Sequence, residues 1–133
     1  MKTPFVALAA GIAIFSAAPV LAHHSFAAEY DANKPVEIKG VVTKVEWTNP
    51  HARFYVDVKD ADGKVTNWNF ELASPNVLVR QGWTRKTLKE GDVITVSGSM
   101  AKDASHMANA RSVITADGRR VFARSAADGG PTQ

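Results

Sequence analysis

The sequence predicts an all-β domain that is rich in strands and contains one short helix. Apolar and polar residues alternate with a period of two in several separate runs, as in strands with one buried face. Asp, Asn, Gly and Pro punctuate these runs, and a single Ser-Pro pair opens the one helical segment. We therefore expect five to six strands arranged as a barrel.

Six alternating runs are expected to be strands. They cover residues 36–47, 53–59, 65–72, 93–100, 107–114 and 119–123. The first run alternates about Gly40, a residue typical of a bulge or bend in a long strand. The third run places Trp68, Phe70 and Leu72 on one face, which we expect to point inward.

Turns and one helix connect the runs. Asn49-Pro50 breaks pairing after the first run, and turn signals also occur at residues 60–63, 90–92, 101–106 and 117–118. Ser74 is suited to cap a helix that starts at Pro75, and Gly82 stands where that helix would end. Three strands, a short helix and two or three further strands match the Greek-key barrel called the OB-fold. An SH3-like barrel and an open sandwich are the alternatives.

The composition predicts one globular domain. Of 133 residues, 45% are hydrophobic and 22% are charged, and there is no Cys. A disulfide framework, a thiolate nucleophile and any Cys-based metal site are therefore excluded. The formal net charge of +3 is a small excess, which is weak ground for a polyanionic partner.

Residues 1–22 have the three parts of a secretory signal. Lys2 precedes an apolar run, and Val20 and Ala22 are the small residues of a cleavage site. The run is shorter than the roughly 20 residues that span a bilayer, so we expect cleavage and export to a bacterial periplasm rather than a membrane anchor. The expected parts of the chain are a signal peptide at 1–22, a leader arm at 23–35, a barrel domain at 36–123 and a flexible tail at 124–133.

Cleavage before His23 would create a nitrogen-rich set of metal ligands. The free α-amino group and the imidazole of His23 can chelate one ion, and His24 adds an imidazole and an ionisable peptide nitrogen. Such flattened nitrogen coordination suits Cu(II) or Ni(II). His51, which follows Asn49-Pro50 in the first turn, is the third candidate ligand. The alternative is a solvated terminus and an ordinary turn histidine.

A second candidate metal site surrounds the loop between the fourth and fifth strands. Its residues are His106, Met100 and Met107, and thioether with imidazole suits Cu(I). Because Met more often fills gaps in a core, this set ranks below the N-terminal one.

A binding surface is the alternative to a metal site. Its candidate residues are Trp47, Asn49, Pro50, Asn76 and Trp83. They would form a recognition edge for a protein, a peptide or a sugar. The residue types that line the grooves by which OB-folds bind single strands or sugars, basic and aromatic, are found at Arg53, Arg80, Arg85, Lys86 and Lys89 with Trp47 and Trp83. Because an exported protein rarely meets nucleic acid, we expect no nucleic-acid partner.

No catalytic motif is evident in the sequence. The serines lack a nucleophile motif, and Asp57, Glu71 and Asp92 occur singly, without an acid or base partner. We therefore expect a binding protein rather than an enzyme. Oxidation at an N-terminal copper site is the enzymatic alternative, and it would need an open coordination position.

The chain resembles a family of small exported bacterial proteins known only as a domain of unknown function. The resemblance rests on H-H-S-F at 23–26, W-T-N-P-H at 47–51, S-P-N at 74–76 and G-W at 82–83. It covers nearly all of residues 23–122 and implies export without implying an activity. The predicted architecture is also similar to periplasmic OB-fold copper and silver chaperones, although their Met spacing is not found here.

These observations lead to one expectation about function. We expect an exported binding protein that takes copper or contacts another periplasmic protein. We expect no membrane contact after the signal has been cleaved. The sequence does not predict the oligomeric state.

Overall fold

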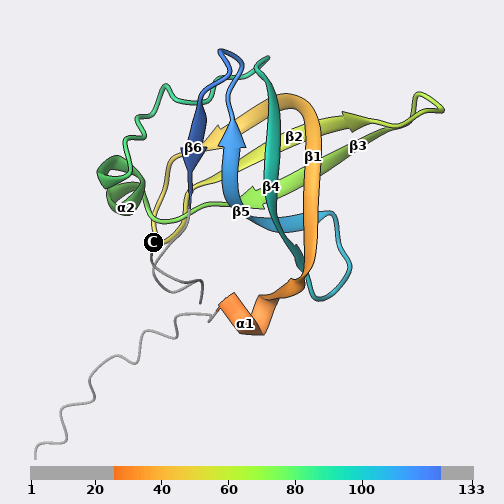
Figure 1. The fold of residues 1–133 in the computed structure, drawn as a ribbon, viewed down its shortest axis with the longest axis horizontal. Coiled ribbons are helices and arrows are strands. Elements are labelled where there is room, and N and C mark those ends of the chain that lie inside the picture. Colours follow the sequence, from red (N-terminus) through yellow and green to blue (C-terminus); the bar gives the residue numbers. More distant parts are fainter. Residues whose placement is uncertain (1–25, 124–133) are drawn as a thin grey trace, which may run out of the picture.

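The computed structural model describes residues 26–123. Within them, six strands and two short helices follow one another (Figure 1). The elements are α1 (Phe26–Glu29), β1 (Tyr30–Glu46), β2 (Arg53–Lys59), β3 (Val65–Glu71), α2 (Pro75–Arg80), β4 (Val93–Ala101), β5 (Met107–Ile114) and β6 (Arg120–Phe122). The predicted signal peptide, His23, His24 and the predicted tail lie outside the described residues.

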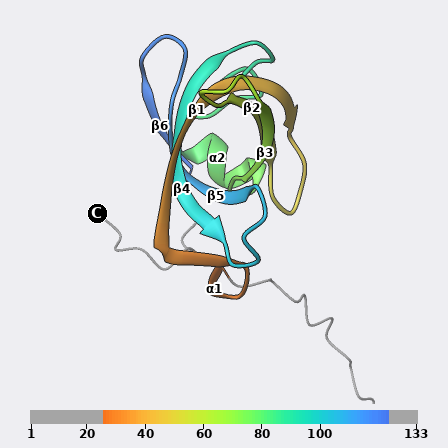
Figure 2. The ribbon, with the colours of Figure 1, turned by 90° about the vertical axis from the view of Figure 1, so that its right-hand side faces the viewer.

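The strands close into a barrel. β1 pairs antiparallel with both β2 and β4, β2 pairs with β3, and β4 pairs with β5. A parallel pairing of β3 with β5, with Asn69 opposite Met107 and Glu71 opposite Asn109, joins the two ends of this series. Figure 2 looks into the ring, with α2 visible through it. This topology, with α2 between β3 and β4, confirms the predicted all-β, OB-like Greek-key barrel.

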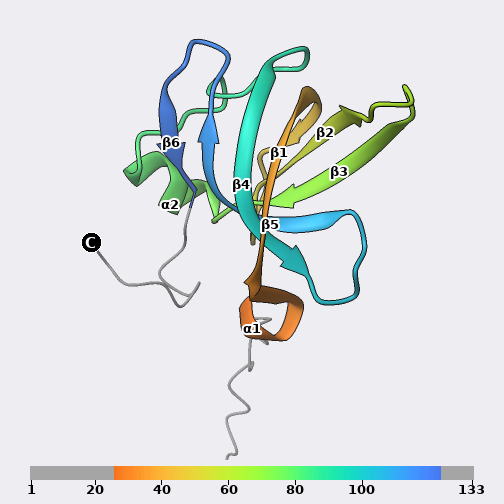
Figure 3. The same cartoon turned by 45° about the vertical axis from the view of Figure 1, so that its right-hand side comes forward.

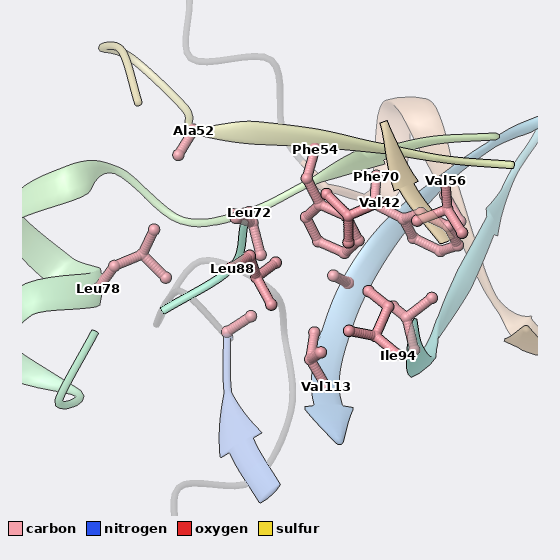
Figure 4. Packing of buried hydrophobic residues seen from close by; sticks show 14 of the residues in the cluster. Val42, Ala52, Phe54, Val56, Phe70, Leu72, Leu78, Leu88, Ile94 and Val113 are labelled. Carbon is pink, nitrogen blue, oxygen red and sulfur yellow. The ribbon is translucent and has the colours of Figure 1, made fainter. Parts of the chain in front are cut away.

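Alternating side chains of the strands fill the barrel. Phe54 and Val56 on β2 and Phe70 on β3 are fully buried, and the rings of Phe54 and Phe70 stack with their centroids 5.2 Å apart (Figure 4). Each such side chain stabilises the fold by about 1.5–3 kcal/mol. Of the three residues predicted to face inward on the third strand, Phe70 and Leu72 are buried, and Trp68 packs partly buried against the core.

β1 begins at Tyr30, six residues before the predicted start at Val36. The expected leader arm at 23–35 is therefore wrong for residues 26–35, which form α1 and the beginning of β1. The physical reason is pairing with β4, because Tyr30 lies opposite Ala101 and Pro35 lies opposite Ser99. The turn-forming residues between them are accommodated by an irregularity in the register.

The other elements end within one residue of their predicted positions. Ser74 caps α2, because its Oγ accepts a hydrogen bond of 3.4 Å from the Val77 amide, and Pro75 occupies the first turn. Gly82, which follows the helix, has the positive φ of 92° that Gly adopts readily. In the described part of the chain, neither helix has the length and apolar character needed to cross a membrane.

Candidate functional site

The backbone around His51 is held against the end of β3. The amide of Ala52 donates to the carbonyl of Ala73 at 3.1 Å, and the amide of Leu72 donates to the carbonyl of Ala52 at 2.8 Å. These two bonds place His51 at the start of β2, beside the last residues of β3. Because these bonds fix the backbone at Ala52, they also hold His51, the residue before it, in place.

One nitrogen of the His51 ring is hydrogen-bonded to the backbone, and the other is open to a ligand. Nδ1 lies 3.0 Å from the carbonyl oxygen of Leu72. Because a carbonyl oxygen only accepts hydrogen bonds, Nδ1 carries the proton and donates it. In the neutral ring Nε2 then keeps its lone pair, and among the described residues no hydrogen bond to it is found. The side chain is 36% exposed, so this nitrogen can meet a ligand.

Glu71 lies beside His51 and is a buried carboxylate, 6% exposed. Its Oε2 accepts a hydrogen bond of 2.5 Å from Nη2 of Arg53 and one of 3.1 Å from the Tyr30 hydroxyl. Its Oε1 lies 4.0 Å from Nδ1 of His51. A buried charge requires such partners, because an unpaired carboxylate in this position would be strongly destabilising. Tyr30, Glu71, Arg53 and His51 are called the Glu71 cluster below.

The Glu71 cluster lies on the outer face of the barrel. Arg53 and Glu71 stand opposite one another on β2 and β3, and the residues next to them in sequence, Phe54 and Phe70, point into the core. Tyr30 reaches the cluster from the start of β1 and is itself only 2% exposed. Burial, together with the negative charge of Glu71 and the hydrogen bond to it, raises the pKa of the Tyr30 phenol above its ordinary range.

The surroundings of His51 match those of a metal-binding histidine. Such a histidine usually donates the N–H of its non-coordinating nitrogen to a carbonyl or a carboxylate, which orients the ring. His51 donates to Leu72 and has Glu71 behind it. Within residues 26–123, no three His, Asp or Glu side chains are grouped to hold a metal ion. Further ligands would have to come from elsewhere, and His23 and His24 lie outside the described residues.

The second predicted metal set does not assemble. Met100 lies opposite Ala108, the residue after Met107, so the two methionines project from opposite faces of the sheet. The Met107 sulfur lies 3.9 Å from Nη1 of Arg53, and the His106 ring meets Trp68 edge-on at 5.2 Å. These three predicted ligands therefore do not converge on one point.

The residues of the predicted binding surface divide into exposed and buried ones. Asn49, Pro50 and Asn76 are exposed, and Trp47 is half-buried against the core. Trp83 is 2% exposed, and its indole N–H donates to the carbonyl of Phe122 at 2.8 Å. The prediction of Trp83 as a surface contact is wrong, because its ring packs into the barrel core.

The outer faces of β2 and β3 carry a polar network beside the cluster. The Asn67 amide donates to Asp57 at 2.8 Å, and Nη1 of Arg53 donates to the Asn69 side chain at 3.2 Å. The Tyr55 hydroxyl reaches Glu46 at 3.4 Å. Hydroxyl, amide and carboxylate groups in one layer can recognise a polar ligand. In OB-folds this face is a common ligand-binding surface.

A separate surface hollow of about 540 Å³ lies between the start of β4 and the end of β5. Its lining includes Asp92, Ile94, Ile114 and Thr115, and none of the predicted site residues. No histidine lines it. Among the described residues, the buried carboxylate and its hydrogen-bonding partners are grouped instead in the Glu71 cluster.

Sequence reasoning found His51 from the Asn-Pro-His turn but missed Tyr30, Arg53 and Glu71 as its neighbours. Glu71 and Tyr30 are 41 positions apart in the sequence, and no spacing pattern links them. The alternation that points Phe70 and Leu72 into the core places residue 71 on the outer face, so no local pattern signals that its carboxylate is buried.

Comparison with known proteins identifies a family and one solved structure. A family model described as a family of unknown function (DUF6152) matches residues 12–110. No curated protein matches the chain. The mitochondrial single-stranded DNA binding protein Rim1 of S. cerevisiae is similar in structure, with a TM-score of 0.49 and 10% sequence identity. That likeness covers 62% of this chain and 92% of Rim1.

Proposed function

The chain belongs to this family of unknown function, DUF6152, and we propose that it is an exported binding protein that holds Cu(II) between its processed N-terminus and His51. The ligands are the α-amino nitrogen and imidazole of His23, the imidazole or peptide nitrogen of His24, and Nε2 of His51. These are nitrogen donors, which suit the flattened coordination of Cu(II).

The observation that carries this proposal is the orientation of His51. Its Nδ1 donates to Leu72 at 3.0 Å, which leaves Nε2 as the coordinating atom on a half-exposed ring. Glu71 at 4.0 Å supports the positive charge that the ring gains when it coordinates a cation.

A second observation supports the meeting of the terminus with His51. The Tyr30 hydroxyl and the His51 ring both approach the carboxylate of Glu71. His24 precedes Tyr30 by six residues, four of which form α1. Even with the remaining residues extended, covalent geometry keeps the backbone of His24 within about 15 Å of that of Tyr30. Tyr30, the first residue of β1, thus shares a carboxylate with the proposed ligand His51.

A Cu(II) titration of the processed chain tests the proposal. A variant with one extra Ala before His23 moves the α-amino group away from the His23 ring, and His51→Ala removes the third ligand. We expect each change to weaken binding by about tenfold or more, since loss of even an outer-shell partner of a metal ligand lowers affinity about 10–100-fold. His106→Ala is the matched control and should bind as tightly as the unmodified chain. Equal affinity in all four proteins would refute the proposal.

The polar face of β2 and β3 favours one alternative, a module that binds a protein, peptide or sugar without metal. Asn49 and Pro50 are exposed at its edge, and Asn67 and Asn69 present amides on its surface. In that case the His51→Ala variant would leave copper affinity unchanged. Substitution of Asn67 and Asn69 by Ala would instead abolish binding to an immobilised glycan or peptide array.

A further inference from the structure

Charge is divided unequally between two parts of the described chain. Residues 79–89 and 111–122 together carry seven Lys or Arg and one Asp. The rest of residues 26–123 carries seven basic and eleven acidic residues. The modest net charge of the whole chain therefore conceals one strongly basic portion and one acidic portion.

The two basic segments meet at one end of the barrel. The Trp83 amide donates to the carbonyl of Leu78 at 2.9 Å, and its indole N–H donates to the carbonyl of Phe122 at 2.8 Å. The amide of Ala123 donates to the carbonyl of Arg111 at 3.0 Å. Figures 1 and 3 both show α2, the loop after it and β6 side by side at this end. Trp83 thus holds the loop after α2 against β6.

Two large apolar side chains are exposed on the two segments. Val79 on α2 is 58% exposed and Phe122 on β6 is 57% exposed. In β6, Val121 packs toward the core, so Arg120 and Phe122 project outward together. The surface, called the basic face below, consists of Val79, Arg80, Arg85, Lys86, Lys89, Arg111, Arg119, Arg120 and Phe122, and Asp117 pairs with Arg119 at 2.7 Å.

We propose that the basic face docks on an anionic phospholipid bilayer. Cationic side chains are attracted to a negatively charged headgroup layer, and exposed apolar side chains among them can enter the boundary with the acyl chains. Val79 is aliphatic and cannot stack on a base, and Trp83 is buried, so Phe122 is the one exposed aromatic ring of the basic face and does not form a platform for successive bases. These features favour lipid over a nucleic acid. The inference replaces the expectation of no membrane contact after cleavage, and it does not depend on copper binding.

Co-sedimentation of the processed chain with vesicles tests this inference. Vesicles of equal parts phosphatidylglycerol and phosphatidylcholine should bind the chain, and vesicles of phosphatidylcholine alone should bind it far more weakly. The double variant Arg85→Glu/Lys86→Glu should lower the affinity by at least about 25-fold, from about fivefold for each cation removed. Phe122→Ser should lower it by about tenfold because less apolar area enters the membrane.

The matched control carries the same charge change on the β2–β3 hairpin. Lys59→Glu/Lys64→Glu alters two exposed lysines outside the basic face, and this variant should lose far less affinity for the anionic vesicles than Arg85→Glu/Lys86→Glu. Near-ultraviolet circular dichroism checks that every variant is folded. Equal losses in both double variants, or no binding to the anionic vesicles, would overturn the inference. So would binding to an oligothymidine or to polyglutamate through the basic face without vesicle binding.

Discussion

The hydroxyl of Tyr30 donates a hydrogen bond of 3.1 Å to the carboxylate of Glu71, which lies 41 positions later in the chain. This contact ties the first residue of β1 to the last residue of β3. Since the same carboxylate binds Arg53 and lies 4.0 Å from His51, it links the N-terminal end of the barrel to the candidate ligand. The stability of the barrel and the position of the proposed copper site therefore depend on the same cluster.

Replacement of Tyr30 by Phe should destabilise the fold. It removes one donor to a buried carboxylate, and a hydrogen bond to a charged group contributes about 2 kcal/mol. Urea unfolding at neutral pH should show this loss without a change in the denaturant slope. Tyr55→Phe is the control, because its hydroxyl contact with Glu46 is longer, at 3.4 Å, and less buried. Equal losses in the two variants would contradict the anchoring role of Tyr30.

The phenol of Tyr30 should resist ionisation in the folded protein. Burial and the neighbouring Glu71 raise its pKa, so the folded state holds the phenolic proton more tightly than the unfolded state does. The resulting stabilisation is complete below the unfolded phenol pKa of about 10 and declines as the pH rises above it. Tyrosinate absorbance should show one phenol that ionises late, and this phenol should be missing from Tyr30→Phe. Ionisation of Tyr30 at an ordinary pKa in the folded state would be inconsistent with the buried contact.

Glu71→Gln should be more damaging than Tyr30→Phe. The substitution preserves shape but leaves the Arg53 guanidinium, which is 28% exposed, without its carboxylate. Removal of one partner from such an ion pair destabilises a protein by about 3 kcal/mol. For a domain of this size that lowers the Tm by roughly 10–20 °C. The control is Glu46→Gln in the exposed pair with Lys44, which should leave the Tm unchanged. A Tm for Glu71→Gln within error of the unmodified chain would show that the pair contributes nothing.

Gly98→Ala should disrupt the barrel at the pairing of β4 with β5. A Cβ at this position would collide with the backbone carbonyl of Asn109, which cannot move without breaking the pairing. We expect a loss of about 3 kcal/mol or a largely insoluble protein. Ser97→Ala, at the neighbouring position, is the control and should remain soluble with nearly unchanged urea unfolding. Normal folding of Gly98→Ala would show that β4 and β5 are less closely paired.

The strands that the sequence predicts well have one face in the core. β2 begins and ends at the predicted residues because alternation continues through its whole length. β5 also has its predicted bounds, although its burial does not alternate, because a polar loop precedes it and an Asp-Gly turn follows it. The sequence predicts a start for β1 that is six residues too late, because Asp31, Asn33 and Pro35 have the composition of a turn. Their incorporation into the strand depends on pairing with β4, a contact between distant segments that no local pattern reveals.

The candidate site was predictable only where local chemistry identifies it. His51 stands out because a proline turn precedes it. Its relation to Glu71 depends on the register that places Arg53 opposite Glu71 and on the arrival of Tyr30 from β1. The sequence places Trp83 at the surface as an aromatic residue of a possible binding groove, and a Gly-Trp pair after a helix does not indicate that the ring turns into the core.

Pulsed electron paramagnetic resonance of the Cu(II)-loaded, processed chain tests whether Nε2 of His51 coordinates the copper. The remote nitrogen of a coordinated imidazole produces a characteristic modulation, so the number of histidine ligands can be counted. We expect His51→Ala to lose one equatorial imidazole and His106→Ala to keep the full number. Identical modulation in the unmodified chain and in His51→Ala would show that His51 is not a ligand.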